Sequence, residues 1–175
     1  MIGRRSMLSG AVALLTGAAT APLARAAEAC GGFRWDVAAE MALFRGSAIP
    51  VVAGRSPSPA PLLDVGRLYA VALAPQGDVE LAAPPAKPML ADGAHAGILR
   101  IQVPAAGRYR VSQDAHFWVD VLQAGKLLPS VDFQGSIGCE PQKVVMFDMP
   151  AGSEILVQFS GSAQAVVRVA VTAAG

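Results

Sequence analysis

The chain has 175 residues, with 14 lysines and arginines against 13 aspartates and glutamates, and a formal net charge of +1. Its three lysines and eleven arginines are scattered along the sequence rather than clustered. This pattern excludes a nucleic-acid-binding protein, because phosphate contacts require a basic patch or stripe. A chain of this length indicates one domain with a hydrophobic core of its own.

The first 27 residues resemble a cleaved signal peptide of the twin-arginine type. Arg4 and Arg5 precede a mildly apolar stretch, residues 8–23, and the small residues after it fit a signal-peptidase site following Ala26 or Ala27. The apolar stretch has 16 residues and is interrupted by glycine and proline, so it is too short and too weak to span a bilayer. We therefore expect no transmembrane segment in the mature protein.

The signal peptide predicts a periplasmic or secreted protein. Removal of residues 1–27 leaves 148 residues with 11 basic and 13 acidic side chains, a net charge of −2. The mild hydrophobicity of the signal and Arg25 near the cleavage site favour the twin-arginine route. A general secretory signal that only resembles the twin-arginine type is the alternative.

The two cysteines, Cys30 and Cys139, lie far apart in the mature chain. In an oxidising compartment two cysteines most simply form one disulfide. Closing a loop of this length would stabilise the fold by about 3–5 kcal/mol in the chain-entropy model. The alternatives are a reactive thiol, a metal site, or lipidation of Cys30 just behind the signal peptide.

Residues 28–63 are expected to hold one short helix and a proline-rich loop. Val37, Met41 and Phe44 have helical spacing, and Asp36 is a candidate N-cap. Four prolines between residues 48 and 61 favour an extended surface loop.

Residues 64–175 alternate apolar and polar side chains with a period of two, which is typical of strands. The expected strands are residues 67–74, 79–83, 98–103, 108–112, 117–122, 143–149, 154–160 and 165–172, separated by turn residues. About eight strands and one short N-terminal helix indicate a mostly β fold, an antiparallel β-sandwich or jelly roll.

Three segments resemble the bacterial pre-peptidase C-terminal type of β-sandwich: an Ala-Gly-x-Tyr strand in residues 104–111, a strand in residues 118–121 before a glycine turn, and an Ala-Gly turn in residues 150–161. The mature chain is also similar, at residues 33–37, 87–90 and 131–135, to small exported bacterial proteins without an assigned role. Some members of that group carry the label homogentisate 1,2-dioxygenase. That enzyme holds iron with two histidines and a carboxylate in a cupin, whereas His95 and His116 are the only histidines here and lack the cupin spacing. No iron ligand is carried over.

The best candidate binding site is a strand on which His116, Trp118 and Asp120 alternate and so point to one face. An aromatic ring flanked by an imidazole and a carboxylate is suited to stacking on a sugar ring and bonding its hydroxyls. The alternative is that Trp118 packs under a loop or on a second core face.

The sequence contains none of the common catalytic motifs for zinc, serine or phosphate chemistry, and it predicts no cofactor. The favoured hypothesis is a non-catalytic binding or accessory module with a small-molecule or glycan ligand and no known protein partner. An envelope-associated interaction protein is the second hypothesis. A metal-dependent oxygenase or hydrolase is the third, disfavoured for lack of ligands.

Overall fold

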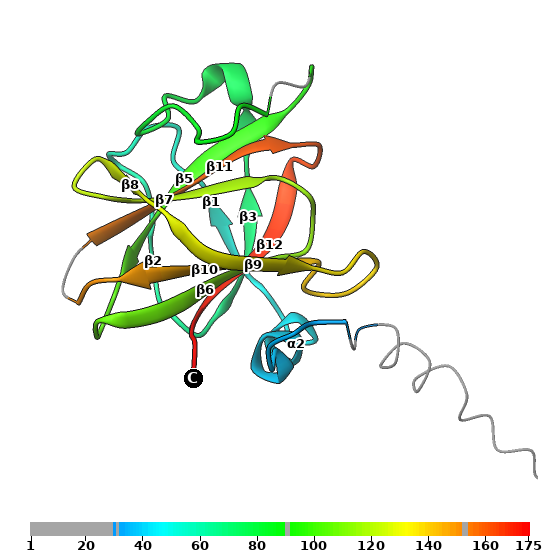
Figure 1. Ribbon diagram of the computed structural model, residues 1–175. Coiled ribbons are helices and arrows are strands. Elements are labelled where there is room, and N and C mark those ends of the chain that lie inside the picture. Colours follow the sequence, from blue (N-terminus) through cyan, green and yellow to red (C-terminus); the bar gives the residue numbers. More distant parts are fainter. Residues whose placement is uncertain (1–29, 31, 90–91, 152–153) are drawn as a thin grey trace, which may run out of the picture.

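The computed structural model (Figure 1) describes residues 30, 32–89, 92–151 and 154–175. The predicted signal peptide, including Arg4 and Arg5, lies outside the described residues. In chain order the elements are α2 (Ala38–Phe44), β1 (Ile49–Val52), β2 (Leu62–Leu63), β3 (Leu68–Ala72), β4 (Ala74–Pro75), the 3-10 helix η1 (Gln76–Asp78), β5 (His95–Gln102), β6 (Gly107–Gln113), β7 (Trp118–Gln123), β8 (Lys126–Leu128), β9 (Ser130–Gly135), β10 (Lys143–Met149), β11 (Glu154–Ser162) and β12 (Val166–Ala173).

The strands form two sheets of six, and the predicted β-sandwich is confirmed. Sheet A has the order β1-β3-β12-β6-β10-β9, and sheet B has the order β2-β5-β11-β7-β8, with β4 also paired to β5. The sheets are mixed rather than purely antiparallel, because β1 runs parallel to β3 and β2 runs parallel to β5. The chain passes from β1 in sheet A to β2 in sheet B and back to β3, and such crossover connections permit parallel pairing.

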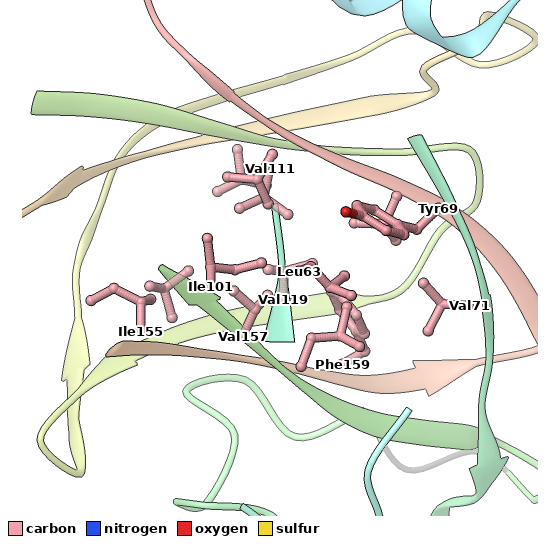
Figure 2. Packing of buried hydrophobic residues seen from close by; sticks show 14 of the residues in the cluster. Leu63, Tyr69, Val71, Ile101, Val111, Val119, Ile155, Val157 and Phe159 are labelled. Carbon is pink, nitrogen blue, oxygen red and sulfur yellow. The ribbon is translucent and has the colours of Figure 1, made fainter. Parts of the chain in front are cut away.

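The core lies between the two sheets, where the inward-facing residues of both meet (Figure 2). Tyr69, Val71 and Val111 come from sheet A, and Ile101, Val119 and Phe159 come from sheet B. Phe117 and Phe159 stack edge to face with ring centroids 5.3 Å apart, an arrangement that aromatic pairs prefer. The alternation that predicts the strands also determines which side chains enter the core.

The N-terminal segment covers the outer face of sheet A. Phe44 of α2 packs against Leu68 and Ala170. Asp36 lies one residue before the N-cap, Val37, and its carboxylate accepts a hydrogen bond of 2.9 Å from the Ala38 N–H. The predicted helix is therefore confirmed. Asp36 bonds to its first turn from the position before the N-cap rather than from the N-cap itself.

Cys30 and Cys139 form the predicted disulfide, with their Cα atoms 5.5 Å apart. The bond joins the N-terminal segment to the connection between β9 and β10, residues 136–142, which we call the β9–β10 loop. Because the Cys30 sulfur is used in this bond, the lipidation alternative does not apply to this structure.

A covering loop, residues 79–89, lies over the outer face of sheet B. The prediction of a strand at residues 79–83 is wrong: Val79 and Glu80 donate to the backbone carbonyls of Gln76 and Arg55, and Ala83 bonds to a side chain, so no strand pairing forms. Gln158 donates to the Ala83 carbonyl at 3.0 Å and accepts from its N–H at 3.3 Å. At the end of the loop, Met89 packs on Gly161, where an added Cβ would lie 2.2 Å from the Met89 Cβ.

The proline-rich segment contains strand β1 rather than only a loop. Pro50 lies in β1 at an edge of sheet A, where a missing backbone N–H is tolerated. Short strands β8 and β9 were also not predicted as separate strands. The segment before residue 64 is thus part of both sheets through β1 and β2.

Candidate functional site

A groove lies on one side of the sandwich, between β7 of sheet B and β9 and β10 of sheet A. It consists of two adjoining cavities of about 570 and 610 Å³. Both cavities are lined by Lys87, Trp118, Phe133 and Lys143. Met89, His116 and Ile137 add to the first cavity, and Leu127, Val145 and Phe147 add to the second. We call this region the Trp118 groove.

The groove is open because strand β8 covers only half of β7. β8 pairs with residues 121–123 of β7, and no strand among the described residues pairs with residues 118–120 on that side. The chain turns at Ala124 and Gly125, both with positive φ, and then crosses from sheet B to sheet A between β8 and β9. The inner face of β9 and β10 is consequently left without a facing strand at this edge.

Apolar side chains are exposed around the groove for the same reason. Phe133 of β9 is opposite Val145 of β10 in the register and so points to the same side, toward the interior. Yet Phe133 is 62% exposed, because sheet B does not extend over it. Ile137 in the β9–β10 loop is 94% exposed.

Trp118 lies at the junction of the two cavities, with cations on its ring. The Lys143 Nζ is 5.3 Å and the Lys87 Nζ is 5.8 Å from the ring centroid, both within the range of a cation–π interaction. The indole N–H donates a hydrogen bond of 2.8 Å to the Asp120 carboxylate. Asp120 therefore fixes the orientation of the ring that the lysines contact.

Neither lysine forms an ion pair with an acidic side chain in the described part of the chain. All seven ion pairs of the described residues involve arginine, and none includes Lys87 or Lys143. Burial in the groove, and next the positive charge of Lys87, lower the pKa of the Lys143 ammonium. The groove thus combines a largely apolar lining with two lysines and one buried carboxylate, Asp120, which lines the second cavity.

The three residues of the predicted site have different environments. His116 is exposed and lines the first cavity, and Trp118 is half-buried and lines both. Asp120 is 5% exposed and lies under the covering loop. Its carboxylate also accepts hydrogen bonds from the Gln158 amide at 3.2 Å and from the Ala86 N–H at 3.3 Å.

This arrangement bears on the expected role of Asp120, whose carboxylate also lines the second cavity. Three donors of the protein already bond to this carboxylate, which reduces its capacity to accept from the hydroxyls of a sugar. Trp118 has features of both alternatives, a ring open to a ligand and a ring packed under a loop. It lines both cavities of the groove, and its N–H lies toward the buried Asp120. Binding by His116 and Trp118 remains a prediction.

Sequence reasoning did not identify Lys87, Lys143 or Phe133 as site residues. Lys143 did carry a signal: it has the strand parity of Val145 and Phe147, two core residues, so a charged residue occupies an inward position. Lys87 carried none, because a loop residue cannot be assigned to a face by periodicity.

No family model matches the chain, and no curated protein or solved structure matches it. The resemblances to exported β-sandwich proteins stay expectations from the sequence. Within residues 30–175, apart from the undescribed positions, no group of three His, Cys, Asp or Glu side chains is placed to hold a metal ion. No helix in the described part of the chain is long and apolar enough to cross a membrane.

Proposed function

We propose that this protein is a non-catalytic binding protein for small amphipathic anions, with the Trp118 groove as its site. The apolar part of the ligand packs against Trp118 and Phe133, and its carboxylate, sulfonate or phosphate pairs with Lys87 and Lys143. The observation that carries the proposal is the pair of lysines on one tryptophan ring in a largely apolar groove, where neither lysine forms an ion pair with a described residue.

The energetics of the groove support an anion over a neutral ligand. Burying a charge without a partner costs free energy, and an incoming anion offsets that cost at Lys143. A neutral glycan would leave both ammonium groups uncompensated. The volumes of about 570 and 610 Å³ suit small molecules, whose pockets usually measure roughly 300–1,000 Å³.

The same proposal places the protein in the periplasm or outside the cell. Arg4 and Arg5 and the apolar stretch behind them support export, with the twin-arginine route as the favoured one. The Cys30–Cys139 disulfide supports an oxidising compartment, because such bonds are rare in reducing ones.

A second candidate function, an envelope-associated interaction protein, is favoured by the exposed apolar side chains beside edge strand β9. Phe133 and Ile137 are 62% and 94% exposed, and large apolar residues gathered at an edge often mark a protein contact. For this function we expect the protein to fractionate with membranes and Ile137→Asp to move it to the soluble periplasm. Unchanged fractionation would count against it.

Fluorescence of Trp118 tests the binding proposal directly. The chain has two tryptophans, and Trp35→Phe removes the other while keeping an aromatic ring on Arg110. In this background we expect para-methylbenzoate to quench Trp118, and para-methylbenzylamine, of the same shape and opposite charge, to have no effect.

Matched lysine variants complete the test. Lys143→Gln should weaken binding about ten-fold, since each desolvated ion pair contributes on the order of 1–2 kcal/mol. Lys126→Gln, at the exposed start of β8, should leave it unchanged. Equal binding of the amine and the carboxylate, or no effect of Lys143→Gln, would show that the proposed function is wrong.

A further inference from the structure

Lys143 occupies a different environment from the other lysines of the chain. The chain has three lysines, and Lys87 and Lys126 are both exposed. Lys143 is half-buried at the start of β10, with the inward parity of Val145 and Phe147. Its ammonium lies over Trp118 in a groove that is open to small molecules.

Such surroundings favour the nucleophilic form of an amine. Only the neutral amine attacks a carbonyl, and apolar burial together with a second cation both disfavour the charged form. Both causes act on Lys143, and they lower its pKa. Neither lysine is held by an acidic side chain of the described residues that would keep it protonated.

We propose that Lys143 is a covalent capture site for carbonyl compounds that carry an anionic group: its Nζ forms an imine with an aldehyde or ketone whose anion pairs with Lys87. The inference rests on the proposed function, because the anion must first bind in the groove. It adds a covalent bond and a narrower ligand class, oxo acids with an apolar body.

The step balances without any further reagent. The neutral Nζ attacks the carbonyl carbon, a C–N bond forms, and the electron pair of the C=O π bond moves to oxygen. The carbinolamine oxygen takes up both protons that the nitrogen loses and leaves as water. The product is the imine between Lys143 and the ligand, and hydrolysis reverses the step with no oxidation or reduction.

The geometry supports different roles for the two lysines, with Lys87 pairing with the anion and Lys143 attacking the carbonyl. Lys87 and Lys143 both line both cavities and share one ring, so a ligand short enough to lie across Trp118 can reach the two together. Lys87 is exposed on the covering loop and suited to an ion pair, whereas Lys143 is the more buried and suited to attack.

Reductive trapping tests the proposal on the purified protein. We expect para-formylbenzoate with cyanoborohydride at pH 7 to modify Lys143 faster than Lys126, since a lowered pKa leaves more of the amine neutral and the groove holds the ligand beside it. Peptide mass mapping identifies the modified residue, with the exposed Lys126 as an internal reference in the same molecule. Excess para-methylbenzoate, which has no carbonyl group, should slow the reaction.

Two variants separate the covalent step from binding. Lys143→Arg keeps the charge and cannot form an imine, so para-methylbenzoate should still bind while trapping at position 143 is lost. Lys87→Gln should reduce trapping at Lys143 about ten-fold by removing the partner of the anion.

The possible failures are distinguishable. If para-methylbenzoate binds but Lys143 is modified no faster than Lys126 in the wild-type protein, the covalent proposal is overturned and the binding function stands. If para-methylbenzoate does not bind and Lys143 shows no preference, both are overturned. The wild-type measurement requires no variant to fold.

Discussion

The two walls of the Trp118 groove are held in different ways. On the sheet A side, the β9–β10 loop is linked to the N-terminal segment by the Cys30–Cys139 disulfide, and Arg34 forms an ion pair of 3.0 Å with Asp132 of β9. On the sheet B side, the covering loop is held by neutral and charge-assisted hydrogen bonds to Gln158 and Asp120.

This difference separates global stability from ligand binding. A covalent cross-link acts largely by restricting the unfolded chain, so its loss is felt by the whole domain. Hydrogen bonds to one loop act on the local equilibrium between its closed and open positions. We therefore expect changes on the sheet A side to lower the unfolding free energy most, and changes under the covering loop to affect affinity as well.

Removal of the disulfide should have the largest effect. Cys30→Ser with Cys139→Ser opens a link between residues 109 positions apart and should lower the free energy of unfolding by about 3–5 kcal/mol. Urea unfolding monitored by circular dichroism measures the loss. Wild-type protein under reducing agent should lose a similar amount, and a double variant as stable as the oxidised protein would contradict the assignment.

The buried ion pair beneath α2 should come next. Glu40 is 1% exposed, and its carboxylate accepts from Arg110 at 3.2 Å and from the Thr172 hydroxyl at 2.7 Å. Glu40→Ala leaves Arg110 with no acidic partner among the described residues and should cost about 3 kcal/mol, measured by urea unfolding.

The matched control for Glu40→Ala is an ion pair on the surface of the same sheet. Asp148→Ala breaks the exposed pair with Arg108 and should cost at most about 1 kcal/mol. Equal losses of unfolding free energy for the two variants would show that the buried Glu40–Arg110 pair stabilises the fold no more than the exposed Asp148–Arg108 pair.

Gln158→Ala tests whether the covering loop, which forms the sheet B side of the Trp118 groove, contributes to stability and to ligand binding. Gln158 is 1% exposed and bonds both backbone groups of Ala83, so the variant should cost about 1–3 kcal/mol and weaken ligand binding through Lys87 on the same loop. Urea unfolding and Trp118 quenching measure the two effects. Gln102→Ala, on the exposed side of β5, should change neither. Undiminished affinity in Gln158→Ala would mean that the covering loop does not shape the groove.

The smallest effect is expected from Lys143→Gln, which should raise the free energy of unfolding slightly. The folded-state pKa of Lys143 lies below its unfolded value, so the unfolded chain binds more protons between the two and wild-type stability rises with pH across that range. At neutral pH the variant should be more stable, within about 0.5 kcal/mol, and the gain should fade as pH approaches about 10.

Thermal unfolding at both pH values measures this gain. An anionic ligand should then raise the melting temperature of the wild type more than that of Lys143→Gln. A variant that is less stable at neutral pH would mean that Lys143 stabilises the fold, contrary to a residue retained for binding.

The sequence predicts the sandwich because the large apolar residues that enter the core alternate along the long strands, although the middle residues of β5, β10 and β12 are buried on both faces. The alternation in β5, β6, β10 and β12 predicts both the strand and the side chains that enter the core. Residues 79–83 also alternate, but Glu80 bonds to the Arg55 carbonyl and Ala83 bonds to the Gln158 side chain, 75 residues away, which no local pattern encodes.

The candidate site was predicted only in part, and the reason is geometric. Trp118 and His116 were found because one strand supplies both. Lys87 and Lys143 meet at Trp118 from a loop and from the opposite sheet, so their proximity depends on how the sheets end. Asp120 was placed on the correct strand, yet whether a carboxylate meets solvent or a covering loop depends on tertiary structure.

The disulfide also has a consequence for the order of events during biogenesis. Cys30 leaves the ribosome 109 residues before Cys139, so the bond closes only after most of both sheets has been synthesised. If the chain crosses the membrane already folded, its thiols leave a reducing compartment unpaired, and the sandwich itself holds them in position for a late oxidation. If it crosses unfolded, Cys30 meets the oxidising compartment alone and remains open to mixed disulfides until Cys139 follows. Under the proposed export, the oxidation state of Cys30 at the time of translocation would thus distinguish the twin-arginine route from the general secretory route.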